Sequence, residues 1–138
     1  MDNRALNYLA LGKKGRLVEL GEEPVGAVAR AVKARLVIVA SDASDHTWRR
    51  AKSFVAGTEQ QCIRVPFTKE ELGFVVGRTS LAIAAFTDAA MALAFVKALP
   101  NAEKFAEVAD ALDVKAKKLR QRKDEAKAHQ RNVRKGKK

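Results

Sequence analysis

Residues with catalytic or metal-binding chemistry are scarce in this sequence. Its one cysteine, Cys62, excludes an intrachain disulfide framework and a cysteine metal cluster, and it suits a reducing cytoplasm. Its two histidines, His46 and His129, lie in distant parts of the chain and do not have metal-site spacing. Neither a Walker loop nor a GxGxxG loop is present. We therefore expect a cytoplasmic protein with no catalytic residues, no cofactor and no metal, and not an enzyme.

Aromatic residues are also few, at 6% of the chain, whereas hydrophobic residues make up 47%. The core should therefore be aliphatic and rich in alanine. The one long apolar run, 81–99, is split by Thr87 and Asp88 into two pieces, each too short to span a bilayer. A buried strand followed by a helix explains this run better, so we expect no membrane partner.

The net charge of +11 is concentrated at one end of the chain. Residues 1–113 contain 15 Lys or Arg and 14 Asp or Glu, which leaves a net charge of +1. Residues 114–138 contain 12 Lys or Arg and 2 Asp or Glu, which leaves +10. The chain is therefore an electrostatically ordinary body with a polycation attached.

The basic end predicts a contact with RNA, because its cations can neutralise several phosphates. It has no aromatic side chain for base stacking, so we expect weak sequence selectivity there. The alternative is a solvated, promiscuous polycation or a solubilising end. The candidate RNA-binding residues of this region are Lys115, Lys117, Lys118, Arg120, Arg122 and Lys123.

Hydrophobic periodicity predicts helices that alternate with strands. Apolar runs predict strands over 16–20, 36–40, 61–65 and 81–86, the last three of them buried. Helical spacing predicts helices over 3–13, 24–33, 41–57, 69–77 and 89–99. The alternation predicts an α/β fold, a three-layer α/β/α sandwich over residues 1–100.

Several residues of these elements have specific expected roles. Pro24 suits the first position of its helix, which is expected to bury Val28 and Val32 among others. Asp42 and Asp45 are expected to cap the helix over 41–57. Cys62 and Trp48 fit packing roles better than those of a nucleophile and a base-stacking platform.

Residues 101–138 form a predicted basic helical extension with a disordered end. One face of this helix is marked by apolar residues at spacings of three or four: Phe105, Val108, Leu112, Ala116 and Leu119. Beyond Leu119 the apolar face gives way to charged residues. We expect the helix to dock on the domain at its start and to project from it afterwards.

Three segments together resemble one known family: LVIVASDAS (36–44), KEELGFVVGR (69–78) and AIAAFTD (82–88). They are similar to the L-seven-Ae ribosomal-protein superfamily, with its L-thirty-e and Gadd-forty-five members, and most similar to its bacterial YlxQ-type branch. The resemblance covers about residues 4–99 and implies an α/β/α sandwich that binds RNA.

Many members of that family bind kink-turns in RNA, through the start of the second helix and two nearby loops. The matching positions here are residues 21–27, with Gly21, Glu22 and Glu23; Asp42 with Ala43; and residues 77–80, with Gly77, Arg78 and Thr79. A helix N-terminus offers free N–H groups to phosphate, and acidic side chains there can accept from base amino groups.

The kink-turn signature of the family is only partly kept in this sequence. Gly21 matches it, whereas Glu23 stands at the Asn or Lys position, Pro24 at the Glu or Gln position, and Ala27 at the Lys position. The resemblance therefore implies the fold and RNA association more directly than it implies kink-turn recognition.

Together these observations predict a non-catalytic, ribosomal-protein-like protein that associates with ribosomal or other structured RNA. The start of the second helix and the basic end would make the contacts. The alternative is a protein-interaction or dimerisation module of the Gadd-forty-five type without a specific RNA, in which the face with Phe105, Val108 and Leu112 packs on a partner. The sequence does not predict the oligomeric state.

Overall fold

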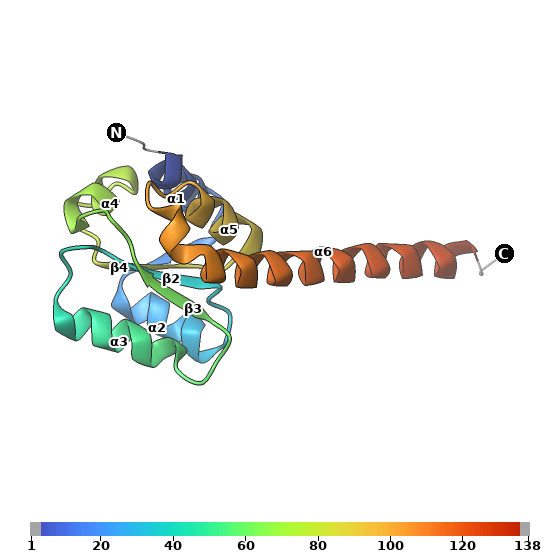
Figure 1. Ribbon diagram of the computed structural model, residues 1–138. Helices are drawn as coiled ribbons and strands as arrows, with labels where there is room; N and C mark the ends of the chain where they lie inside the picture. Colours follow the sequence, from blue (N-terminus) through green and yellow to red (C-terminus); the bar gives the residue numbers. More distant parts are fainter. Residues whose placement is uncertain (1–3, 136–138) are drawn as a thin grey trace.

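The computed structural model describes residues 4–135, with side chains through His129, and has a four-stranded sheet at its centre (Figure 1). The strands are β1 (Val18–Leu20), β2 (Leu36–Val39), β3 (Gln61–Arg64) and β4 (Ile83–Phe86). Their order across the sheet is β1-β4-β2-β3. Each strand lies within a predicted apolar run and is one or two residues shorter than that run.

The strand directions bring the ends of four strands together at one edge of the sheet. β2 pairs with β3 in parallel, and β4 pairs antiparallel with both β1 and β2. The carboxyl ends of β1, β2 and β3 therefore meet the amino end of β4 at the same edge. We call this the switch edge, because the helices that follow β1, β2 and β3 all begin there.

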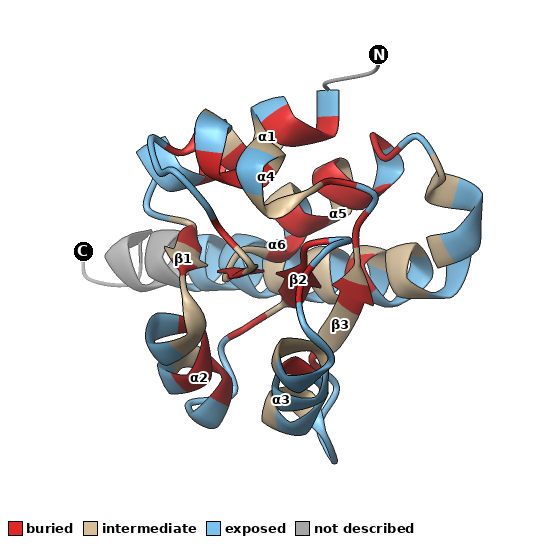
Figure 2. Cartoon of the chain, turned by 90° about the vertical axis from the view of Figure 1, so that its left-hand side faces the viewer, coloured by how far each residue is buried: buried red, intermediate tan, exposed pale blue. Residues whose placement is uncertain are grey.

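Helices cover both faces of the sheet and complete the three layers that the sequence predicts (Figures 1 and 2). One layer contains α2 (Glu22–Arg30) and α3 (Asp45–Val55), and the other contains α1 (Arg4–Lys14), α4 (Lys69–Val75) and α5 (Ala89–Lys97). The central strands β2 and β4 are buried along their whole length, as a sheet covered on both faces requires. The predicted α/β/α sandwich is confirmed.

The core between these layers is mainly aliphatic, as the composition predicts. Leu36, Val37 and Ile38 of β2 are fully buried. Two of the few aromatic residues meet in the centre, where the ring centroids of Phe86 and Phe95 are 4.9 Å apart. The two rings are tilted by 42° to one another, and an aromatic contact of this kind adds stability beyond the area that it buries.

Side-chain caps define where three of the helices begin. Ser44 Oγ accepts a hydrogen bond from the Thr47 N–H at 3.1 Å at the start of α3. Thr68 and Glu71 form a reciprocal capping box at the start of α4. Asp88 Oδ2 accepts from the Met91 N–H at 2.8 Å at the start of α5. These bonds satisfy N–H groups that have no partner within the helix.

Two expectations for the second helix are wrong. The helix begins at Glu22 and not at Pro24, which is tolerated as the third residue because N–H groups of the first turn have no intrahelical acceptor. The helix also ends at Arg30, so Val32 is not buried on it. Val32 lies in the following loop with φ of 56° and 55% exposure, and Val28 is only half-buried.

The expectation that 61–65 forms a buried strand holds only in part, because Ile63 and Val65 are buried and the other three residues are half-buried. β3 is the last strand of the sheet, so one of its sides has no neighbouring strand among the described residues. Ile63 is its only buried residue, and Cys62 and Arg64 are half-buried. An apolar run of four or five residues does not distinguish an edge strand from a central one.

The extension consists of a short 3-10 turn, η1 (Ala102–Phe105), and the 30-residue helix α6 (Ala106–Lys135). Leu112 is 2% exposed and Phe105 and Val108 pack against the core, so the helix docks at its start as predicted. From Arg120 to His129 every side chain is exposed. At 1.5 Å per residue the helix is about 45 Å long, and most of it projects from the domain as an arm (Figure 1). Residues 136–138, at the end for which disorder is predicted, lie outside the described residues.

The apolar run 81–99 forms β4 followed by α5, as the sequence predicts. Across residues 4–135, no helix has the length and apolar character needed to cross a membrane.

Candidate nucleic-acid interface

The three loops predicted to contact RNA all lie at the switch edge. The Gly21 N–H donates to the Ile83 carbonyl at 3.0 Å, and the Ala40 N–H donates to the Ala82 carbonyl at 2.9 Å. These bonds tie the chain before α2 and α3 to the start of β4. The loop 77–80 leads directly into that strand, so residues far apart in the sequence form one surface.

Side chains of this edge confirm the proximity of the loops. A Cβ placed on Gly21 would lie 3.6 Å from Arg78 Nη1. Asp42 Oδ1 accepts a hydrogen bond from the Lys69 N–H at 2.8 Å, and the Lys69 carbonyl accepts from the Leu81 N–H at 2.9 Å. The structure therefore brings Gly21, Asp42 and Arg78 to one edge, as the resemblance implies.

Asp42 does not cap the helix that the sequence suggests. It accepts from the first residue of α4, whereas Ser44 caps α3 and Asp45 is the first residue of that helix. The carboxylate thus links two loops and stabilises the positive end of a helix dipole. The position of Asp42 just before α3 predicted that it caps that helix, but tertiary contacts place its carboxylate at the start of α4.

The start of α2 differs from the starts of α3, α4 and α5 because no side chain caps it. Gly21 occupies the N-cap position with φ of 96°, a conformation that favours glycine. The N–H groups of Glu22 and Glu23 therefore lie at an uncapped positive helix end, which suits an anion. These two acids would oppose that anion if nothing balanced their charge.

Arg50 of α3 balances one of them, because its guanidinium forms an ion pair with the Glu22 carboxylate. Sequence reasoning missed this residue, although the cations Arg49, Arg50 and Lys52 within four positions were a visible signal. Arg50 also lies over the Phe54 ring, with its guanidinium carbon 5.5 Å from the ring centroid. Glu23 remains exposed next to the pair.

Trp48 has the packing role that the sequence predicts. Arg64 lies over its ring at 5.0 Å from the centroid and Lys52 lies at 5.3 Å, while the side chain packs against the core. Cation–π contacts of this kind cover the ring and fix the cations next to it. The indole is therefore not an open platform for a base.

The loop from Gly77 to Ser80 is held from both sides. Lys13 Nζ donates to the Val76 carbonyl at 2.6 Å, and the Arg78 N–H donates to the Gly73 carbonyl at 2.8 Å. Gly77 has φ of 75°, which lets the chain reverse after α4. Arg78 and Thr79 are exposed, so this fixed loop presents a cation and a hydroxyl to solvent.

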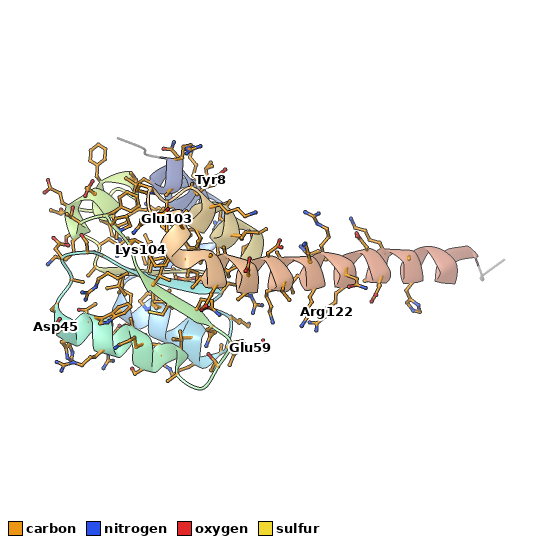
Figure 3. All side chains as sticks on the ribbon, in the orientation of Figure 1. Tyr8, Asp45, Glu59, Glu103, Lys104 and Arg122 are labelled. Carbon is orange, nitrogen blue, oxygen red and sulfur yellow. The ribbon has the colours of Figure 1, made fainter. Side chains whose placement is uncertain are left out.

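The basic arm lies at the other end of the domain from the switch edge. Figure 3 shows Asp45, at the start of α3, at the end away from the arm, and Glu59, before β3, at the end from which α6 projects. Of the predicted arm residues, Lys117, Lys118, Arg120, Arg122 and Lys123 are exposed, and Lys115 is half-buried. Lys117 Nζ is 3.0 Å from Asp113 Oδ2. The structure therefore does not bring the two predicted groups of RNA-binding residues together.

Cys62 has no features of a reactive thiol. Burial raises the pKa of its thiol from 9.0 to about 12, and positive Lys52 opposes this shift only in part. A reactive cysteine requires a lowered pKa, because the thiolate is the nucleophile. No group of three or more His, Cys, Asp or Glu residues within the described part of the chain could hold a metal ion.

We expect Cys62 to react with iodoacetamide about thirtyfold more slowly in the native protein than in urea at pH 8. A pKa near 12 in place of 9.0 lowers the thiolate fraction about a thousandfold, and the greater nucleophilicity of the more basic thiolate offsets about thirtyfold of this. Because the folded pKa is raised, the stability contributed by the protonated thiol is lost as pH rises from about 9 towards 12. Mass spectrometry of the alkylated protein gives both rates, and equal rates would contradict the expectation.

No model of a protein family matches this chain, and no curated protein matches it in sequence. Solved structures do. A Bacillus halodurans protein of unknown function superposes with a TM-score of 0.60 at 23% identity, over 78% of this chain and 97% of that one. The 15.5 kD RNA-binding protein of Giardia lamblia superposes with a TM-score of 0.54 at 18% identity, over 75% of this chain and 88% of that one. These likenesses establish the fold.

Proposed function

We propose that this protein is a non-catalytic RNA-binding protein of the cytoplasm, of the L-seven-Ae type and its YlxQ-type branch. The observation that carries the proposal is the basic arm. Residues 114–138 hold a net charge of +10, and α6 presents much of it to solvent on a helix that projects from the domain. Exposed cations arranged along one rod suit the phosphates of a nucleic acid.

The domain supports the same proposal at the switch edge. N–H groups and cations surround one turn there. They come from the uncapped start of α2, from the Arg50–Glu22 pair and from Arg78. The Giardia neighbour is an RNA-binding protein with this fold. RNA contacts at the switch edge and along the arm would lie at opposite ends of the domain, so the bound RNA is large or folded, as ribosomal RNA is.

Crosslinking in cells, followed by sequencing of the bound RNA, tests the proposal. We expect enrichment of ribosomal RNA or of another structured RNA, and cofractionation with ribosomal particles if the RNA is ribosomal. A parallel culture expressing residues 1–113 controls for RNA that is recovered through the arm alone. Recovery of no RNA above background with the full chain would contradict the proposed function.

The start of α2 allows a sharp test of kink-turn recognition. Glu23→Asn combined with Ala27→Lys should tighten binding to a kink-turn hairpin about tenfold, because the pair removes a repelling carboxylate and adds a charged donor. Both residues are exposed, so the fold should persist. Electrophoretic mobility shift with a straight duplex of equal length measures selectivity.

Glu103→Asn combined with Ala90→Lys is the matched control. These residues are also exposed, and the pair changes the net charge equally but lies outside the switch edge. An equal gain in the control, or an equal gain for the straight duplex, would show that the edge is not a disarmed kink-turn site.

The interaction-module alternative loses the observation that motivated it. Phe105, Val108 and Leu112 pack against the core of the same chain, so they do not form an open docking face. We therefore retain RNA binding as the proposed function.

A further inference from the structure

A cleft separates the first exposed turns of α6 from the domain, at the end opposite the switch edge. Its volume is about 660 Å³, within the usual range for small-molecule sites. One wall consists of the loops before β2 and β3, and the other is the face of α6 between Ala111 and Lys118. The cleft therefore lies where the basic arm leaves the domain.

The wall formed by the two loops is held together by one buried glutamine. Gln60 Oε1 accepts from the Ala34 N–H at 3.0 Å, and Gln60 Nε2 donates to the Ala29 carbonyl at 3.2 Å. Gln60 is 8% exposed, so these bonds are shielded from water. The loop after α2 and the loop after α3 thus form a single preorganised surface.

Cations outnumber acids in the cleft. Arg35, Lys115 and Lys118 line it together with a single acid, Glu59. Among the described residues, the buried Nε of Arg35 has no hydrogen-bond partner. That atom is closed to solvent and therefore to a ligand, but the half-buried Arg35 side chain lines the cleft, and its positive charge would attract an anionic oxygen there.

Aliphatic side chains line the rest of the cleft. Val32 and Val114 are 55% and 52% exposed, and the buried Leu112 lies between the helix and the domain. Val32 has φ of 56°, a left-handed conformation that is rare for a β-branched residue and that costs energy. Two valines exposed to water beside three cations form a surface for a ligand that is partly apolar and partly anionic.

We infer that this cleft receives a nucleotide of single-stranded RNA. Its phosphate would lie near Arg35, Lys115 and Lys118, and its ribose and base would contact Val32 and Val114. The inference rests on the proposed function and deepens it, because it assigns RNA to a site outside the switch edge. The cleft is smaller than a duplex, so the nucleotide must be unpaired.

The arm extends this site beyond the cleft. Lys115, Lys118 and Arg122 are separated by three and four positions, so they lie on one face of α6. The face that carries Lys115 and Lys118 lines the cleft, and Arg122 continues it along the projecting helix. A track of cations favours a chain with an anion in every unit, and therefore favours RNA over an acidic peptide from a partner protein.

Two charge-matched variants of the full chain test the cleft. Lys115→Ala with Lys118→Ala removes two cations from its wall, and Lys117→Ala with Arg120→Ala removes two from the opposite face of the same helix. The probe is a labelled oligouridylate of about 16 nucleotides, near the upper site size of single-strand-binding modules. Fluorescence anisotropy at several salt concentrations gives affinity and salt dependence.

We expect the cleft pair to weaken binding about tenfold and to flatten the salt slope by about 1.4, as loss of two single-strand phosphate contacts predicts. Arg35→Gln should also weaken binding, whereas the opposite-face pair, which lies on the arm but outside the cleft, should weaken it only about threefold. Circular dichroism verifies that each variant is folded. If the cleft pair and the opposite-face pair weaken binding equally, the RNA site in the cleft is overturned and the proposed function stands. If the parent chain does not bind the probe, the proposed function itself is contradicted.

Photocrosslinking identifies what occupies the cleft. Benzoylphenylalanine in place of the exposed Val114 should give an adduct in cells that ribonuclease shortens, with Gln121 as the control position on the arm. An adduct at Val114 that resists ribonuclease and contains a second protein would overturn the inference. So would an RNA adduct at Gln121 with none at Val114.

Discussion

Removing residues 114–138 is expected to weaken binding to single-stranded RNA about a hundredfold, at salt concentrations from low to physiological. If about five of the twelve arm cations contact phosphates, the slope of log affinity against log salt is about −3.5. The domain should keep its fold after this truncation, because Leu112 is the last buried residue among the described side chains of α6 and remains in place. Titration of the oligouridylate probe at several salt concentrations measures the affinity and the slope.

A full-length chain with glutamine at the Lys and Arg positions of 114–138 separates charge from helix length. It keeps the long helix but not the cations, so it should bind as weakly as the truncated protein. If the truncated protein binds as tightly as the full chain with the same slope, the arm is a solubilising end and not an RNA contact. If only the truncated protein is impaired, the helix surface and not its charge makes the contact.

Gly73→Ala is expected to lower the free energy of unfolding by about 2 kcal/mol and to displace one loop of the switch edge. A Cβ at this position would lie 2.8 Å from the Arg78 carbonyl oxygen and 2.8 Å from the Ser80 nitrogen. Both are main-chain atoms, so the loop must shift, and the cost lies towards the upper end of the range for overpacking. The better helix propensity of alanine offsets up to about 1 kcal/mol.

Two further glycines make the experiment a graded series. A Cβ on Gly12 would lie 2.4 Å from Val18 Cγ2, a side-chain atom, and a Cβ on Gly15 would have no neighbour closer than 3.5 Å. We expect urea unfolding to rank Gly73→Ala and Gly12→Ala as destabilising, with Gly15→Ala within about 0.5 kcal/mol of the parent. A Gly73→Ala protein as stable as the Gly15→Ala protein would contradict the close packing of the loop.

The positions of the switch edge and the arm limit how RNA can bind. A short RNA that fills the switch edge cannot also follow the outer part of α6, because the two surfaces lie at opposite ends of the domain. Contacts to both require an RNA that wraps the domain or two RNA segments brought together. An RNA that follows the arm can also enter the cleft, since the cleft lies where α6 leaves the domain.

Local patterns were enough to predict most of the fold. The apolar runs around β2 and β4 and the helical spacing around α3 and α5 depend on neighbouring residues only, and the structure confirms all four elements. The predicted boundaries were less exact, as α2 shows. Its start depends on the turn at Gly21, where the sequence alone placed Pro24 first.

The amino-acid sequence by itself determined the alternation of helices and strands, the aliphatic core and the concentration of charge in the last 25 residues, since each depends on composition or on short-range periodicity. Only the tertiary structure decided that Arg50 pairs with Glu22, that Asp42 stabilises α4, and that the arm leaves from the end opposite the switch edge. The cleft beside Arg35 likewise combines residues about 80 positions apart. The physical reason is that such contacts depend on strand order and helix packing, and no short stretch of sequence contains that information.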